Sequence, residues 1–131
     1  MKLQTILNRL QKLHPKEIDL SLDRVKNLCK KLGNPQNKLK YISVVGTNGK
    51  YSTIQAVRSI LKNANINCNI YTSPHIQKIN ERFIFNDEEI SDDNLSNLLT
   101  EVENVNNGEQ ITYFEILTAA YFYHASKFKD K

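Results

Sequence analysis

Apolar residues recur at helical spacing in the first part of the chain and predict two short amphipathic helices. The first stripe falls at i, i+3, i+4, i+7 and i+10 over residues 3–13. A second stripe occupies residues 22–32, followed by Gly33, the residue type that most often closes a helix, and by Pro35. We therefore expect one helix to end near residue 14 and the next to end at Gly33.

Two apolar runs further along predict buried strands. The β-branched run Tyr41–Val45 is typical of a short strand, and Cys68–Thr72 predicts another. Between them, apolar residues again recur at helical spacing over residues 54–64. A strand, a helical crossover and a second strand predict a parallel pair, with ligands bound beyond the carboxyl ends of its strands.

The second half of the chain predicts a hairpin and a capped helix. Residues 82–85 and 88–90 flank an Asn86-Asp87 turn, an arrangement typical of a β-hairpin. Ser91 is placed to cap a helix whose apolar residues run from 95 to 105.

The last predicted helix begins at Thr112. A Thr N-cap with Glu115 three residues later forms a capping box, in which each side chain accepts from a backbone N–H of the other residue. We expect its buried stripe to consist of Leu117, Tyr121, Ala125 and Phe128.

Composition indicates an ordinary globular domain. The 131 residues are 40% hydrophobic and 24% charged, and their net charge is +4. No apolar run is long enough to span a membrane, and residues 1–4 do not begin a signal peptide, so we expect a cytoplasmic protein. Cys29 and Cys68 are interpreted as small core residues. Nucleic-acid binding is not expected, because no aromatic residues interleave with the lysines.

The glycine-rich segment Gly46–Lys50 carries the strongest candidate chemistry. It joins a predicted strand to a helix N-terminus, where free N–H groups and the helix dipole favour a bound phosphate. Lys50 can reach a terminal phosphate, and a hydroxyl of Ser52 or Thr53 can bind Mg²⁺. The spacing is shorter than that of the common phosphate loop. A glycine turn followed by a solvated lysine is therefore the alternative.

Four motifs, in order, resemble bifunctional dihydrofolate synthase/folylpolyglutamate synthase, a family of the Mur ligase superfamily. The letters of Gly46–Lys50 followed by Ser52-Thr53 resemble its ATP-binding loop, and Tyr71–His75 and Thr112–Glu115 are typical of its folate branch. The fourth motif is Ile18–Val25, which leads into residues 32–35. The residues alone leave open a divergent Mur-type ligation of an amino acid, although residues 112–115 favour folate.

The resemblance implies an α/β fold: a three-layer, Mur-ligase-like P-loop domain with a small parallel sheet. It implies ATP and Mg²⁺ as cofactors, with Lys50 as the catalytic residue and Ser73 as a metal ligand. The residues that match the family's ATP loop are Gly46, Thr47, Asn48, Gly49, Lys50, Ser52 and Thr53. Tyr51 departs from the family pattern, which has glycine at this position.

The resemblance also implies a pteroate or folate site made of two segments distant in sequence. The residues that match it are Lys12, Leu13, His14, Pro15, Thr112, Tyr113, Phe114 and Glu115. From the residues alone, the first segment is a helix end with an exposed His14, and the second is a cap. The segment Ile79–Arg82 resembles one that lies near the folate-binding loop, or its Glu81 and Arg82 form a surface ion pair.

The function implied is an ATP-dependent ligase that adds L-glutamate to dihydropteroate or folate through an acyl phosphate. We expect residues 1–131 to be the N-terminal part of the ATP-binding domain, without the C-terminal glutamate-ligase domain, and inactive by themselves. The C-terminal portion as a separate chain is then a possible partner, while nucleic acid and membranes are not expected. The alternative is a non-catalytic nucleotide-binding remnant that needs a partner chain.

Overall fold

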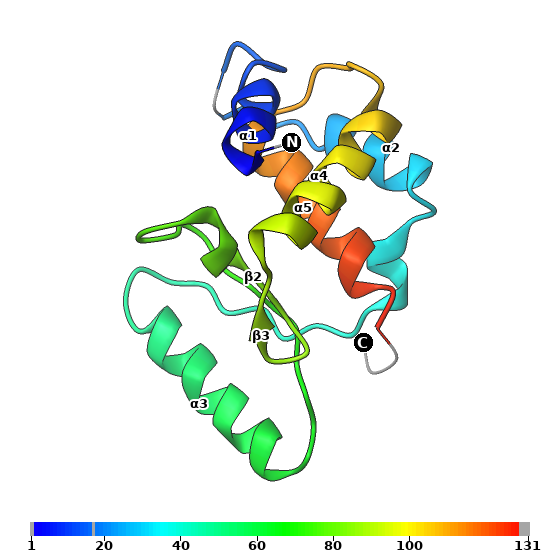
Figure 1. Cartoon of the computed structure of the whole chain (residues 1–131). Coiled ribbons are helices and arrows are strands. Elements are labelled where there is room, and N and C mark those ends of the chain that lie inside the picture. The colour runs from blue at the N-terminus through cyan, green and yellow to red at the C-terminus, as the bar shows by residue number, and fades with distance from the viewer. Residues whose placement is uncertain (1, 17, 129–131) are drawn as a thin grey trace.

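The computed structural model describes residues 2–16 and 18–128. Helices pack together at one end of the molecule, and a small sheet and α3 lie at the other (Figure 1). The elements in chain order are α1 (Leu3–Gln11), α2 (Asp23–Lys31), the 3₁₀ turn η1 (Pro35–Lys38), α3 (Lys50–Asn63), β1 (Ile70–Tyr71), the 3₁₀ turn η2 (Ile79–Arg82), β2 (Phe83–Phe85), β3 (Glu88–Glu89), α4 (Asp92–Asn106) and α5 (Tyr113–Ala125). No helix among these residues is long and apolar enough to cross a bilayer.

The core is organised around α5, which contacts α1, α2, α4 and η1. Ile116 and Leu117 are completely buried, and Tyr121 and Ala125 are almost so. Phe128 packs against the same core from just beyond the helix. The predicted stripe of this helix is therefore confirmed, and the same helix presents its N-terminus to the α1–α2 loop.

The two helices predicted near the N-terminus are confirmed as α1 and α2. The α2 helix ends in a Schellman motif: the Gly33 N–H donates to the Lys30 carbonyl at 3.1 Å, and the Asn34 N–H donates to Cys29 at 2.8 Å. Gly33 has φ +89°, a conformation that favours glycine, so its position after the apolar stripe sets the end of the helix. Cys29 is buried in the core, as predicted.

The predicted hairpin is also present, as β2 and β3. Ile84 pairs with Glu89 and Phe85 with Glu88 in antiparallel register. Both turn residues, Asn86 and Asp87, have positive φ, as the favoured two-residue hairpin turns require. β1 then pairs antiparallel with the other edge of β2, which gives the sheet order β1-β2-β3.

The predicted parallel pair is not found. Tyr41–Val45, expected as a strand, forms no hydrogen-bonded ladder in the described part of the chain. β1 pairs instead with β2, and the pairing is extended when the Asp87 N–H donates to the Cys68 carbonyl at 3.0 Å. An apolar run specifies a buried or extended segment but not its partner, and here the partner is strand β2 of the hairpin, which follows β1 after residues 72–82. The α/β mixture was predicted correctly, but the sheet is antiparallel rather than parallel.

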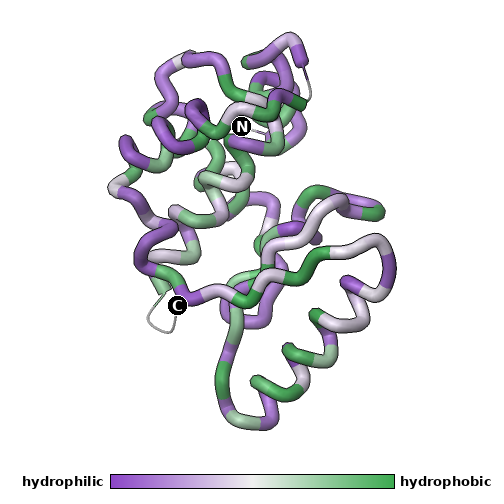
Figure 2. The backbone as a smooth tube through the Cα atoms, turned by 180° about the vertical axis from the view of Figure 1, so that it is seen from behind, coloured by the Kyte–Doolittle hydropathy of each residue, from purple (hydrophilic) through white to green (hydrophobic). Residues whose placement is uncertain are grey.

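The helix that follows the glycine loop is the least buried of the long helices. α3 has no buried residue, although its apolar positions recur as predicted and are visible as green segments in Figure 2. Ile54, Val57 and Leu61 line one wall of an open groove of about 910 Å³, which also borders residues 39–45, residues 66–71 and α5. A guanidinium contact fixes α3 to the hairpin turn, with Arg58 Nη2 2.7 Å from the Asp87 carbonyl.

We expect α3 to open locally far more readily than α5. Few apolar atoms leave water when α3 forms, whereas α5 carries the core. In native-state hydrogen exchange, the amides of α3 should exchange at least about tenfold faster than those of α5, a difference of 1.4 kcal/mol or more in opening free energy. Equal protection of the two helices would contradict this assignment.

Candidate functional site

The glycine loop leads directly into a helix N-terminus, as the sequence predicts. α3 begins at Lys50, and Gly49 is its N-cap with φ +77°. Gly46 has φ +144°, so two positions of this loop use backbone conformations that L side chains rarely adopt. Within the described chain, the N–H groups of residues 47–52 donate to no protein acceptor. These groups and the dipole of α3 therefore remain available for an anion.

The side chains around this loop all face solvent. Lys50, Ser52 and Thr53 are exposed, so the ammonium and both hydroxyls are accessible to a ligand. Tyr51 is 72% exposed, which means that its phenol is directed away from the protein interior. The ring is therefore not part of the core, and its place in the first turn of α3 requires no positive φ.

The loop after β1 is fixed by one carboxylate. Glu81 accepts hydrogen bonds from the N–H groups of Ile76 at 2.8 Å, Gln77 at 3.0 Å and Lys78 at 3.2 Å. These bonds, that from Ile76 foremost, lower the pKa of Glu81 below its ordinary value. Glu81 thus orders residues 76–78 instead of pairing with Arg82.

The same loop carries Ser73, which is exposed. Its neighbour His75 accepts a hydrogen bond through Nδ1 from Arg82 Nε at 2.9 Å. Figure 1 draws this loop and the glycine loop toward the N-terminal end of α3. Among the described residues, no group of three or more His, Cys, Asp or Glu side chains is placed to hold a metal ion.

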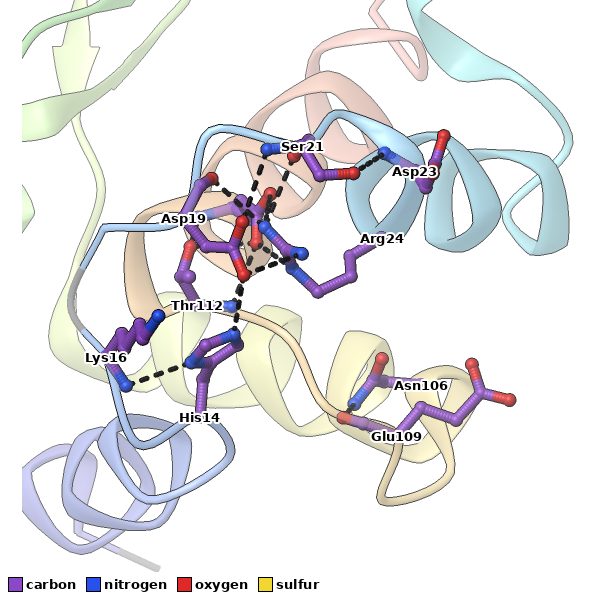
Figure 3. A network of polar contacts seen from close by, with 10 residues as sticks. His14, Lys16, Asp19, Ser21, Asp23, Arg24, Asn106, Glu109 and Thr112 are labelled. Atoms are coloured by element: carbon purple, nitrogen blue, oxygen red, sulfur yellow. Dashed lines mark hydrogen bonds and ion pairs between the residues drawn. The ribbon is translucent and has the colours of Figure 1, made fainter.

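The two segments assigned to pteroate lie together, although they are about a hundred positions apart in sequence. Figure 3 shows His14 beside Asp19, close to Thr112 at the start of α5. His14 Nε2 lies 3.3 Å from Asp19 Oδ2, and Arg24 Nη1 lies 3.1 Å from the same oxygen. Arg24 Nε in turn lies 2.9 Å from Glu115 Oε1.

These contacts divide the predicted pteroate residues into two groups. His14 and Thr112 are buried and Glu115 is largely so, and all three are engaged in contacts within the protein. The expectation of an exposed His14 is therefore wrong, because Asp19 covers its ring. The residues that remain accessible, in whole or in part, are Lys12, Leu13, Pro15, Tyr113 and Phe114.

The capping box predicted at α5 is confirmed. The Thr112 hydroxyl accepts from the Glu115 N–H at 3.3 Å, and Glu115 Oε1 accepts from the Thr112 N–H at 3.0 Å. Burial raises the pKa of Glu115, but the hydrogen bonds from Arg24 and Thr112 outweigh it and hold the pKa below its ordinary value. Glu115 is therefore a carboxylate whose two oxygens both accept hydrogen bonds from within the protein.

Comparison with known proteins finds relatives that match most of the chain. The chain is 39% identical over 113 residues to the dihydrofolate synthase/folylpolyglutamate synthase of Bacillus subtilis, covering 82% of this chain and 26% of that protein. The structure of E. coli FolC in complex with DHPP and ADP superposes with a TM-score of 0.87 at 30% identity, covering 97% of this chain and 31% of the other. The chain is homologous to the N-terminal part of dihydrofolate synthase/folylpolyglutamate synthases.

A second structure extends the comparison to a nucleotide and metal complex. The bifunctional folylpolyglutamate synthase/dihydrofolate synthase of Yersinia pestis, complexed with AMPPNP and a Mn ion, has a TM-score of 0.86 at 30% identity, covering 97% of this chain and 31% of the other. No protein-family model matches the chain. The chain therefore spans between a quarter and a third of the length of these relatives.

Sequence reasoning assigned no role to Arg24 or Asp19. Both lie in the motif Ile18–Val25, which supported the family resemblance only as a string of letters. Arg24 reaches Glu115 across 91 positions of sequence, and no periodicity or spacing rule connects residues so far apart. The opposite charges were visible, but their proximity was not.

The lowered pKa of Glu81 predicts a pH-dependent loop. Its stabilising bonds are complete above the ordinary glutamate pKa of about 4.3 and are lost as pH falls through the lower folded-state pKa. The amide resonances of Ile76, Gln77 and Lys78 should therefore titrate together in NMR, with a midpoint below about 4.3. Glu81→Gln should abolish this transition. A shared midpoint at or above 4.3, or one that survives the substitution, would contradict the role of Glu81.

Proposed function

We propose that this chain supplies part of an ATP-dependent ligase that adds L-glutamate to dihydropteroate or folate. The observation that carries the proposal is the glycine loop 46–50, which leads into the N-terminus of α3 and leaves backbone N–H groups free to bind an anion. The homologous enzymes support the same reading, because their names and nucleotide-bound structures describe folate ligases. The rest of the ATP and glutamate sites would come from residues outside these 131, since the relatives are three to four times longer.

In this proposal the loop and Lys50 bind the phosphates of ATP. Backbone N–H groups of residues 47–52 hydrogen-bond phosphate oxygens, and the ammonium of Lys50 offsets charge on the transferred group. A carboxylate is a poor electrophile until phosphorylation gives it a leaving group, and the amine of glutamate then displaces phosphate. The chemistry needs positioning and charge stabilisation more than a protein nucleophile.

A divalent metal fits this site if the protein and the phosphates of ATP bind it together. Ser52, Thr53 and Ser73 offer exposed hydroxyl oxygens, and ATP phosphates would complete the shell, as Mg²⁺ prefers. Mg²⁺ would neutralise phosphate charge when bound. We assign pteroate contact to the accessible group of residues beside the α5 N-terminus, of which Phe114 is 44% exposed.

Replacing Lys50 tests the phosphate loop. Lys50→Ala should weaken MgATP binding by about 1.5–3 kcal/mol, because a charge-assisted contact to phosphate is lost. Lys62→Ala is the matched control, since Lys62 is an exposed lysine in the last turn of the same helix. Equal affinities for Lys50→Ala and the unaltered chain in calorimetry would refute the assignment.

Replacing Tyr51 tests whether the departure from the family's glycine is tolerated. The phenol is exposed, and its backbone is helical. Tyr51→Gly should therefore change the affinity for MgATP by less than about tenfold, or 1.4 kcal/mol. A gain in affinity of a hundredfold or more would show that the ring obstructs the nucleotide.

A further inference from the structure

The loop between α1 and α2 is attached to the N-terminus of α5 by one bidentate ion pair. Arg24, from the first turn of α2, places Nε 2.9 Å from Glu115 Oε1 and Nη2 3.2 Å from Glu115 Oε2. The two side chains are 18% and 13% exposed. A planar, largely buried arginine–carboxylate pair of this kind fixes orientation as well as distance.

Arg24 also holds the loop itself. Its Nη2 donates to the carbonyl of Asp19 at 3.0 Å and to that of Ser21 at 3.2 Å, and its Nη1 lies 3.1 Å from Asp19 Oδ2. Asp19 Oδ1 accepts from the Ser21 N–H at 3.3 Å. One guanidinium therefore joins the backbone of the loop, a loop carboxylate and the first turn of α5.

His14 completes the network at the other end of the loop. Its Nδ1 accepts a hydrogen bond from the Lys16 N–H at 2.9 Å, so the ring proton lies on Nε2 and faces Asp19 Oδ2 at 3.3 Å. Figure 3 shows the ring enclosed between these two partners. The loop is thus attached to the end of α1, to α2 and to α5.

The arrangement leaves apolar side chains of the loop facing outward. Asp19 points into the network, whereas its neighbours Ile18 and Leu20 are 76% and 90% exposed. Ordering a loop costs conformational entropy, and exposed apolar side chains such as Ile18 and Leu20 do not offset that cost. The contacts of the inward-facing Asp19 therefore hold the loop in this conformation. The network therefore determines which surface the loop presents at the N-terminus of α5.

We propose that Arg24 and Glu115 are positioning residues that latch the α1–α2 loop onto α5 and so shape the pteroate-binding surface. The inference rests on the proposed function, and it changes the role of one residue in it. Glu115 does not contact the ligand, because Arg24 and Thr112 occupy its oxygens. It acts through the loop that Arg24 holds.

The chain provides a matched control for this latch. Arg9 of α1 and Glu103 of α4 form a second bidentate pair, with Nε 3.0 Å from Oε2 and Nη2 2.7 Å from Oε1. It joins α1 to α4 by the same chemistry, and neither of its two residues belongs to the α1–α2 loop. Removing either pair tests the loss of stability caused by breaking a bidentate ion pair, whereas only the Arg24–Glu115 pair holds the loop. Comparing the two variants therefore separates a general loss of stability from an effect on the loop.

The test compares Glu115→Gln with Glu103→Gln in the full chain. Glutamine keeps an oxygen that can accept from Thr112, so the helix cap is retained while the ion pair is lost. Glu115→Gln should raise amide exchange in residues 18–22 by about tenfold and weaken dihydropteroate binding by about tenfold. Glu103→Gln should change either quantity by less than about twofold. Arg24→Lys, which keeps the charge without the bidentate geometry, should fall between Glu115→Gln and the unaltered chain.

Each contrary result identifies what fails. Unchanged exchange in residues 18–22 of Glu115→Gln would overturn the latch. Faster exchange in Glu115→Gln with unchanged affinity for dihydropteroate would overturn the role of the latch in shaping the site. Equal losses of affinity in Glu115→Gln and Glu103→Gln would overturn it as well. If the unaltered chain does not bind dihydropteroate, the proposed function and the ligand half of this inference both fail. The exchange measurement would still decide whether the latch exists.

Discussion

The burial of α5 is the constraint on which the other elements depend. α1, α2, α4 and η1 all contact this helix, and Ile116, Leu117, Ala119 and Ala120 are completely inaccessible to solvent. Burying one isoleucine or leucine contributes roughly 1.5–3 kcal/mol, so the short helices around α5 owe their stability to this packing rather than to their own length. Because the N-terminus of α5 also carries Thr112 and Glu115, the core and the candidate pteroate site share one rigid element.

The sheet is attached to the same helix through aromatic rings. Tyr121 stacks on Tyr71 with centroids 4.8 Å apart and on Phe85 at 5.4 Å, and the Tyr71 hydroxyl lies 3.0 Å from the Thr118 hydroxyl. Rings at these separations add packing beyond the area that they bury. The antiparallel sheet is therefore held against α5, whereas α3 and residues 39–45 border an open groove that α5 also lines.

The two candidate sites are built on different physical principles. The glycine loop depends on local backbone geometry, since Gly46 and Gly49 have positive φ and lead directly into the N-terminus of α3. The candidate pteroate surface depends on contacts between distant segments, above all the pair formed by Arg24 and Glu115. The first site is local to a handful of residues, while the second exists only when α2 and α5 are packed together.

Local chemistry explains what the sequence determined by itself. Helical spacing located α1, α2, α4 and α5, Gly33 and the Thr112–Glu115 box set helix ends, and the Asn86-Asp87 turn identified the hairpin. Each of these depends on residues within a few positions of one another. The family resemblance was also visible in the sequence, because each of its motifs consists of consecutive residues.

Only the tertiary structure decided how the segments pair. Four features depend on contacts between residues that lie 5 to 91 positions apart in sequence. They are the pairing of β1 with β2, the exposure of α3, the burial of His14 and the contact of Arg24 with Glu115. Apolar periodicity predicts which face of a helix or strand is buried, but not which element packs against it. A charged side chain likewise predicts an ion pair without identifying the residue of opposite charge. Packing around α5 makes those choices, since it alone brings the loop after α1 and the start of α5 to the same place.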